Sequence, residues 1–329
     1  MQLLFTALAD GGDGRRWKTL FDRLWPAYRA WYLREGHLAR PTYLECRDAL
    51  RVHMPAMVPI WEQLIDAAGG GDVAARFLSL YCPPQYLSGC SQAVWPGSEP
   101  LLVRNYDYDP NAFEAVVLRT AWGDRAVLGT SDCLIGLVDG INDAGLAVSL
   151  TFGGRRVVGR GFGMPIILRH VLQTCANTPD AVRLLSALPT HMAYNVTVVD
   201  ERRRVQTLQL SPDRPPVVLD VAVATNHQQT VEWESHARET ATVEREDFLL
   251  ARLLLQHDPA EDFVAAFLRP PLYSIHFDRG FGTLYTAALW AQRRVMAYAW
   301  PGSTWELSLG DFREDSRMIE YVRARRRPT

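Results

Sequence analysis

The chain has 329 residues, of which 48% are hydrophobic and 22% charged, and its formal net charge at pH 7 is -2. This composition is typical of a globular protein with one large domain or two modest ones, and it excludes an extended linker protein. The balanced charge offers no basic surface for nucleic acid or for an anionic membrane, so we expect small-molecule partners. Lys18 is the single lysine, and its place in an Arg-rich N-terminal stretch argues against Schiff-base chemistry and a P-loop.

The 5 cysteines are irregularly spaced and form no paired C-x-x-C arrangement, which argues against a structural zinc site and a disulfide scaffold. The short apolar run at the N-terminus has no basic residue before it and meets Asp10 at once, unlike a secretory signal. No apolar run approaches the roughly 20 residues that cross a bilayer. We therefore expect a cytoplasmic protein with reduced thiols and without a metal or cofactor. The sequence is compatible with a homo-oligomer.

The first part of the chain, up to about Tyr86, is predicted to be helical because aromatic and aliphatic residues recur at helical spacing. The second helical run is interrupted near Pro55 and Pro59 and ends in three glycines, and the third leads into a proline pair. The three predicted runs cover residues 17–32, 43–67 and 73–80.

After this part the sequence changes to short, alternating segments that are typical of strands. They cover residues 101–106, 114–121, 126–129, 133–138 and 146–152, and the turn formers at 139–145 predict a hairpin. Two helices are predicted within residues 165–188, strands at 194–199, 204–210 and 217–224, helices at 242–256 and 260–268, and final strands at 283–289 and 295–300. Antiparallel strand runs with helices grouped between them predict a layered α+β fold rather than parallel βαβ units.

Cys90 is the first candidate for chemistry. It follows Gly89, whose missing side chain allows a close approach to the backbone carbonyl, and it precedes a polar pair rather than lying in an apolar run. Other cysteines, namely Cys46, Cys133 and Cys175, are better interpreted as small buried apolar residues.

A polar sequence at the end of the strand that starts at Leu101 forms the second candidate group. Arg104 and Asp107 differ by three positions, so in a strand they point to opposite faces and can contact two sides of one site. The alternative is a polar strand end that enters a turn at Pro110, and spacing alone does not decide between the two interpretations.

Asn226 ends an apolar strand, where its side-chain amide can donate to a developing oxyanion. Taken alone, an ordinary turn asparagine is the better interpretation of this residue. His227 and His276 also lie near polar strand ends, and either is a candidate partner for a thiol.

Taken together, the motifs resemble the penicillin acyltransferase (acyl-CoA:6-aminopenicillanic acid acyltransferase) family of N-terminal nucleophile hydrolases and, more distantly, the choloylglycine hydrolases. The resemblance covers residues 87–300 and rests on the order G-C-S, R-N-Y-D-Y, DGINDAGLAVS, A-Y-N-V-T-V-V-D, V-A-T-N-H and T-V-E-R. It implies a four-layer αββα sandwich over residues 90–329 and a helical, propeptide-like leader over residues 1–89. The leader's removal or displacement would be needed to uncover Cys90.

In the resembled family the nucleophilic cysteine becomes a chain terminus by self-cleavage of the preceding bond, here between Gly89 and Cys90. The residue chemistry agrees, because the thiol can attack the Gly89 carbonyl and water can then release the leader. The freed α-amine of Cys90, with a reference pKa of roughly 7.7 to 8.0, can serve as general base for its own thiol. No histidine is then required.

The resemblance also implies roles for further residues. Asp107 would hold the α-amine, Arg104 would orient Cys90 and depress its thiol pKa, and Asn226 would receive the oxyanion. Arg245 matches a downstream arginine that supports the site.

Two further residues match positions that recur in these families, and one segment differs from the choloylglycine hydrolase pattern. Asn195 and Asp139 are better explained by structural roles in a strand and a turn. Where choloylglycine hydrolases carry an asparagine, residues 150–152 read Leu-Thr-Phe, so a second side-chain oxyanion donor and a bile-salt substrate are disfavoured. A backbone N–H near Ser91 is a substitute donor.

The sequence therefore predicts a self-processing cysteine amidohydrolase or acyltransferase that acts on a linear C–N amide bond through a thioester on Cys90. Hydrolysis is favoured over acyl transfer because water needs no second pocket. Two alternatives stay open. One is an unprocessed thiol hydrolase in which His227 or His276 activates Cys90, and the other is a binding protein that keeps the scaffold without catalysis.

Overall fold

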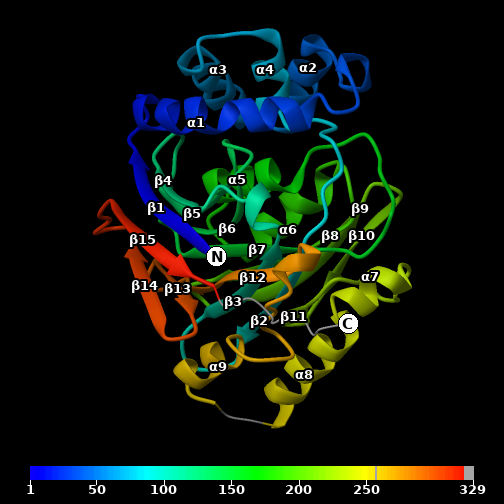
Figure 1. Ribbon diagram of the computed structural model, residues 1–329, viewed down its shortest axis with the longest axis vertical. Coiled ribbons are helices and arrows are strands. Elements are labelled where there is room, and N and C mark those ends of the chain that lie inside the picture. The colour runs from blue at the N-terminus through cyan, green and yellow to red at the C-terminus, as the bar shows by residue number, and fades with distance from the viewer. Residues whose placement is uncertain (256–257, 322–329) are drawn as a thin grey trace.

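The structure is a computed structural model that describes residues 1–255 and 258–321. In these residues the strands form a nine-stranded and a six-stranded sheet, which pack against each other with helices on both outer sides (Figure 1). This four-layer arrangement confirms the predicted α+β sandwich. The predicted helix end at Gln256 lies outside the described residues.

The nine-stranded sheet is largely antiparallel. Its strands lie in the order β10 (Arg214–Leu219), β9 (Val205–Ser211), β8 (Tyr194–Asp200), β7 (Leu146–Phe152), β6 (Gly136–Asn142), β5 (Val127–Asp132), β4 (Val116–Thr120), β1 (Gln2–Asp10) and β15 (Asp315–Glu320). The predicted hairpin between β6 and β7 is confirmed. In its turn the Asn142 side chain accepts hydrogen bonds from the backbone of Ala144 and Leu146, and Gly145 adopts a φ of 75° that favours glycine.

The six-stranded sheet carries the candidate nucleophile. Its order is β11 (Val223–Ala224), β2 (Gly89–Trp95), β3 (Leu101–Tyr108), β12 (Gly282–Trp290), β13 (Val295–Trp300) and β14 (Ser303–Ser308). All neighbouring strands are antiparallel.

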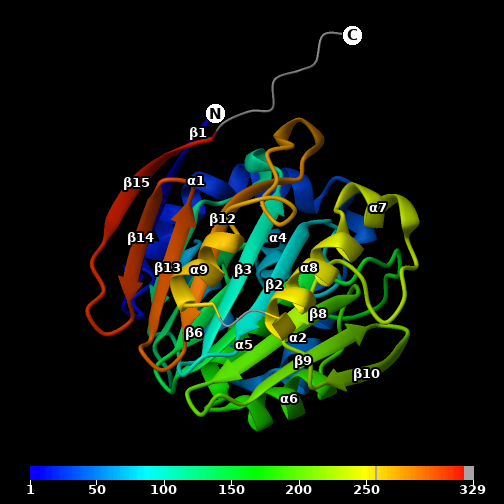
Figure 2. The same cartoon turned by 90° about the horizontal axis from the view of Figure 1, so that it is seen from below.

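Helices cover both outer faces of the sandwich. Against the nine-stranded sheet lie α5 (Met164–Thr174) and α6 (Thr178–Ala187), with α1 (Arg15–Tyr32), α2 (Tyr43–His53), α3 (Val58–Ala67) and α4 (Asp72–Leu78) beyond them (Figure 1). On the other side, α8 (Thr242–Leu255) and α9 (Ala260–Ala266) cover the six-stranded sheet, with α7 (Glu234–Glu239) beside them (Figure 2). Short 3-10 turns lie at His37–Ala39, Pro55–Met57, Pro110–Ala112 and Phe277–Arg279.

The predicted pair of helices within residues 165–188 is confirmed. Pro165 lies in the first turn of α5, where a missing backbone N–H costs no hydrogen bond. Asn177 caps α6 by accepting a hydrogen bond from the backbone of Asp180.

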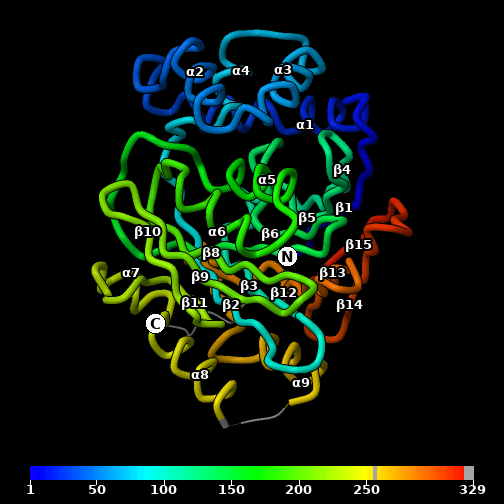
Figure 3. Tube along the Cα trace, turned by 180° about the vertical axis from the view of Figure 1, so that it is seen from behind, coloured from blue at the N-terminus to red at the C-terminus, as the bar shows by residue number. Residues whose placement is uncertain are grey.

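The prediction that the first part of the chain is helical is wrong for residues 2–10. These residues form β1, which pairs in parallel with β4 and antiparallel with β15 (Figure 3). Phe5 and Ala7 alternate with more exposed neighbours and are fully buried, so the period in this short run is that of a strand. Helices do follow at α1 to α4, and the domain boundary at residues 89 and 90 stays a prediction.

A second correction concerns residues 217–224, which were predicted as one strand. The structure divides them between β10 in the larger sheet and β11 in the smaller one, with a break at residues 220–222. Asp220 and the exposed Val221 fall at this crossing. The strand that leads into Asn226 is therefore β11, the direct neighbour of β2.

Two apolar clusters support the layers. The larger one fills the space between the sheets and continues under the leader helices, where Trp17 and Phe77 are fully buried. The smaller one lies between the six-stranded sheet and α8 and α9. Within residues 1–255 and 258–321, no helix is both long and apolar enough to cross a membrane.

Candidate active site

Cys90 lies at the start of β2 and is fully buried. In the antiparallel pair with β3, Gly89 faces Asp107 and Cys90 faces Tyr106. Residues that face each other across a strand pair point to the same side, as do residues two apart. The Cys90 side chain therefore shares one face with Tyr106 and Arg104, whereas Asp107 shares the other face with Gly89.

Arg104 holds the Cys90 sulfur from within the sandwich. Its Nη2 donates to Cys90 Sγ over 3.3 Å, its Nη1 donates to Asp139 Oδ2 over 2.6 Å, and its Nε donates to the Leu150 carbonyl over 2.8 Å. Both Arg104 and Asp139 are fully buried. A buried guanidinium needs such a counter-charge and filled hydrogen bonds, so this ion pair keeps a positive charge beside the thiol.

Asp139 does not have the turn role that we predicted for it, because it lies within β6. Thr130 donates to Oδ1 of this carboxylate over 2.5 Å, and the Tyr285 hydroxyl donates to Oδ2 over 2.7 Å. These contacts make Asp139 a positioning residue that acts through Arg104. Its place in a D-G-x-N motif was visible in the sequence, but the pairing with Arg104 depends on contact between the two sheets.

On the opposite face, Asp107 is held by Arg245, which extends from the first turns of α8. Arg245 Nη1 lies 2.5 Å from Asp107 Oδ2, and Thr283 Oγ1 donates to Oδ1 over 2.6 Å. A Cβ atom placed on Gly89 would lie 3.2 Å from the Cβ of Asp107, so a larger residue here would require Asp107 to move by a few tenths of an ångström. The carboxylate thus lies beside the residue that precedes Cys90.

The Asn226 side chain also reaches Cys90. Its Oδ1 accepts a hydrogen bond from the Cys90 backbone N–H over 2.8 Å, and its Nδ2 donates to the Phe152 carbonyl over 3.1 Å. The backbone N–H of Asn226 donates to Thr242 Oγ1 over 2.6 Å, and Asn195 Nδ2 donates to the carbonyls of Thr225 and His227. Asn195 therefore has the structural role that we predicted, because it fixes the loop that carries Asn226.

The structure thus brings together the predicted residues Cys90, Arg104, Asp107, Asn226 and Arg245 around the bond between Gly89 and Cys90. Ser88, whose hydroxyl lies 3.7 Å from Cys90 Sγ, was not singled out from the sequence, and neither were Thr283 and Tyr285. Hydroxyl residues are frequent in strands and loops, so only their spatial position distinguishes them.

Burial dominates the electrostatics of the site. Loss of solvent raises the pKa of the Cys90 thiol; the positive charge of Arg104 lowers it, but by less, and Asp107 adds to the rise. Arg104 therefore acts in the predicted direction, although in the intact chain burial outweighs its effect on the thiol pKa. Burial likewise raises the pKa of Asp107 against the opposing effect of Arg245.

The histidine alternative receives no support from these contacts. Within the described residues, the hydrogen-bond partners of Cys90 Sγ are Ser88 and Arg104. His227 instead contacts Thr242 through Nδ1 and Glu246 through Nε2, and His276 is exposed on a loop. The described residues also contain no cluster of three or more His, Cys, Asp or Glu side chains that could hold a metal ion.

Comparison with known proteins places this geometry in context. The profile of a family described as acyl-coenzyme A:6-aminopenicillanic acid acyl-transferase matches residues 94–305. No match occurs among curated proteins.

Several solved structures are similar to the chain. A mutant conjugated bile acid hydrolase from Clostridium perfringens is 11% identical over 72% of this chain and 97% of its own, with a TM-score of 0.46. Penicillin V acylase from Agrobacterium tumefaciens is 13% identical over 68% of this chain and 86% of its own, with a TM-score of 0.45. The Caenorhabditis elegans ortholog of N-acylethanolamine-hydrolyzing acid amidase is 15% identical over 62% and 93%, with a TM-score of 0.43.

Proposed function

Because the chain belongs to the acyl-coenzyme A:6-aminopenicillanic acid acyl-transferase family, we propose that it is a self-processing cysteine amidohydrolase that cleaves linear amides through a thioester on Cys90. Membership of this family indicates an enzyme of the amide hydrolase or acyltransferase class. The observation that carries the finer proposal is the double contact at Cys90, where Arg104 donates to the sulfur and Asn226 accepts from the backbone N–H. The first contact is made to the sulfur that would attack, and the second to the nitrogen of the bond that would break.

Processing starts from the intact chain. The Cys90 sulfur attacks the Gly89 carbonyl carbon, the thiol proton passes to the Cys90 nitrogen, and the carbon–nitrogen bond breaks to leave a thioester and a free amine. Water then attacks the thioester, which gives a Gly89 carboxylate and restores the thiol. Arg104 stabilises the attacking sulfur as it gains negative charge, because its guanidinium stays ionised beside Asp139.

Turnover uses the amine that processing creates. The α-amine of Cys90 takes the thiol proton, and the thiolate attacks the carbonyl carbon of the substrate amide. The α-ammonium then protonates the leaving amine, which departs and leaves an acyl thioester. Water, deprotonated by the α-amine, releases the acid. We expect Asp107, which lies beside Gly89 and is contacted by Arg245, to hold the α-ammonium.

Asn226 is the proposed oxyanion donor. A side-chain amide carries two N–H donors, and in the intact chain one of them serves the Phe152 carbonyl. The second is available for the oxyanion of the tetrahedral intermediate. Once the peptide N–H of Cys90 has become an amine, Asn226 Oδ1 can continue to accept a hydrogen bond from it.

The packing of residues 1–88 favours their retention after cleavage rather than their displacement. β1 is hydrogen-bonded on both sides, to β4 and β15, and the indole of Trp17 donates to the Leu134 carbonyl over 2.8 Å. The rings of Tyr81 and Phe162 pack across the same interface, with their centroids 5.1 Å apart. Breaking one peptide bond removes none of these contacts, so we expect two associated fragments.

Intact-mass analysis of purified wild-type protein tests the proposal. We expect two masses under denaturing conditions, one for residues 1–89 and one for a fragment that begins with Cys90, and a single peak in native size-exclusion chromatography. A wild-type protein that stays one chain under all conditions while hydrolysing amides would refute self-processing.

A further inference from the structure

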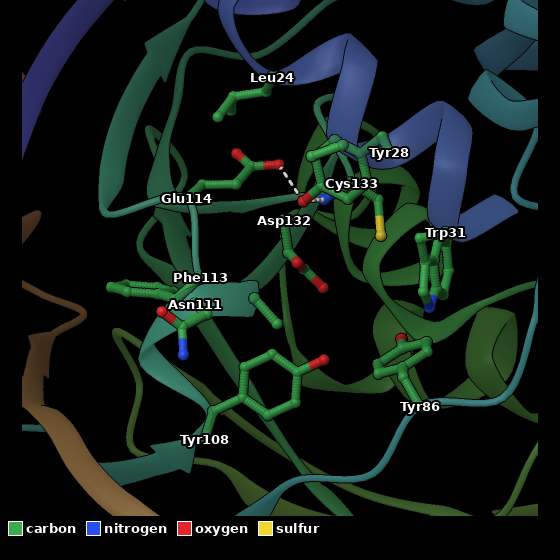
Figure 4. A pocket seen from close by; sticks show the side chains of 12 residues that line it. Leu24, Tyr28, Trp31, Tyr86, Tyr108, Asn111, Phe113, Glu114, Asp132 and Cys133 are labelled. Carbon is green, nitrogen blue, oxygen red and sulfur yellow. Dashed lines mark hydrogen bonds between the residues drawn. The ribbon is translucent and has the colours of Figure 1, made fainter. Parts of the chain in front are cut away.

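A cavity of about 210 Å³ lies between α1 and the interior of the sandwich (Figure 4). Five of its twelve lining residues are aromatic: Tyr28, Trp31, Tyr86, Tyr108 and Phe113. Its rim includes the exposed residues Ala27, Asn111 and Ala112, so the cavity reaches the surface. The leader supplies one part of the wall and residues after Cys90 supply the rest.

Two carboxyl groups line this aromatic cavity, those of Glu114 and Asp132. Both residues are buried, with 7% and 9% of their surface exposed. Glu114 Oε1 accepts hydrogen bonds from the Tyr28 hydroxyl over 2.6 Å and from the Leu134 N–H over 2.8 Å. Its Oε2 is buried and has no hydrogen-bond partner among the described residues.

Asp132 lies at the centre of the pocket, and its carboxylate points toward Tyr86 and Tyr108 (Figure 4). In residues 1–255 and 258–321, no Lys, Arg or His nitrogen lies within 4.0 Å of either carboxylate. Burial and the neighbouring Glu114 raise the pKa of Asp132 to about 7. Arg104 and Arg23 act on these carboxyl groups only from beyond that distance. Neither carboxylate therefore has a paired cation among the described residues, and a buried charge without a partner is costly.

The cavity is lined by Tyr108, which lies on the face of β3 that the nucleophile shares. Tyr108 lies two positions after Tyr106, which faces Cys90 across the strand pair, so all three side chains point to the same side. The rings of Tyr106 and Tyr108 are stacked with their centroids 5.4 Å apart, and the Arg104 guanidinium lies 4.5 Å from the centroid of Tyr106. Packed aromatic side chains therefore connect the lining of the pocket to Arg104, which contacts the thiol.

We propose that this pocket binds the ammonium group of an amine-bearing substrate of the Cys90 site. Aromatic faces attract cations through their negative quadrupole, and the unpaired carboxylates supply the opposite charge. An anionic group would meet Asp132 and Glu114 in a low-dielectric space and be repelled. That the ligand is a substrate depends on the proposed function, whereas the preference for a cation depends only on the lining of the pocket.

The cation preference can be measured without turnover. In Cys90→Ala protein, calorimetric titration at pH 8 compares benzylamine with benzyl alcohol, which has a similar shape and no charge. We expect benzylamine to bind at least about tenfold more tightly, and Asp132→Asn to remove that difference while leaving the affinity for benzyl alcohol unchanged. Asp124→Asn, which removes an exposed carboxylate outside the pocket, is the matched control and should change neither affinity.

Equal binding of the two probes, binding of neither, or an equal loss of both in Asp132→Asn would overturn the proposal. Glu114→Gln provides a second test if Asp132→Asn does not fold, with the same expected loss of the cation preference.

The link to the substrate is tested in wild-type protein with amides whose acyl group ends in an ammonium or in a hydroxyl. We expect Asp132→Asn to lower kcat/KM for the charged substrate at least about tenfold more than for the neutral one. Equal losses would overturn the substrate assignment. Absence of all amide turnover in a protein that keeps the benzylamine preference would instead refute the proposed function alone.

Discussion

Replacing Cys90 with alanine is expected to abolish both cleavage and turnover. The chain should stay one species under denaturing conditions, because the thiol that is proposed to attack the Gly89 carbonyl is missing. Amide hydrolysis should fall by a factor on the order of 10⁴ to 10⁶, in line with the removal of a nucleophile from a hydrolase. Mass spectrometry measures cleavage of the chain, and a product assay measures turnover.

Two variants serve as controls for this experiment. Cys82→Ala removes the most exposed thiol of the described residues and should leave cleavage and turnover unchanged. Cys90→Ser replaces the sulfur nucleophile with an oxygen nucleophile, so the chain should still cleave, but more slowly than wild type. Cleavage of Cys90→Ala at the wild-type rate would show that another group, or a contaminating protease, breaks the chain.

Asn226→Ala is expected to lower kcat by about 10² to 10³ with little change in KM. The oxyanion exists mainly in the transition state, so its donor contributes to the rate rather than to substrate binding. Autocleavage also passes through a tetrahedral intermediate at Gly89, so the variant should process slowly. The kinetics are therefore measured on the fraction that has been cleaved and purified.

Gln229→Ala is the matched control, because it removes an exposed amide from the same loop. It should retain wild-type kcat and KM. If Asn226→Ala instead raised KM and left kcat unchanged, Asn226 would be a ground-state binding residue and the proposed oxyanion hole would be wrong.

Much of the fold was accessible from local patterns. The helices at α5 and α6, the hairpin between β6 and β7, and the layered α+β class follow from periodicity and turn residues. The role of β1 was not accessible, because its partners lie more than 100 residues away in β4 and 300 away in β15. The division of residues 217–224 between two sheets also depends on tertiary packing rather than on local propensity.

In the candidate site, too, the features that depend on tertiary packing could not be predicted from the sequence. Arg104 and Asp107 could be assigned to opposite faces from their spacing, and the order of motifs brought Asn226 and Arg245 into the same site. The net pKa of the Cys90 thiol could not be inferred, because it depends on how deeply the intact chain buries the sulfur. The contact of Asp139 with Arg104 likewise arises from the packing of the two sheets.

Identification of the residue that carries the acyl group tests the central claim most directly. Processed protein is mixed with an activated ester of the preferred acyl group, quenched in acid and analysed by mass. The account predicts an acyl increment on the fragment that begins with Cys90, localised to that residue and removed by hydroxylamine, as expected for a thioester. An acyl group on any other residue, or turnover by a protein in which Cys90 is alkylated, would contradict it.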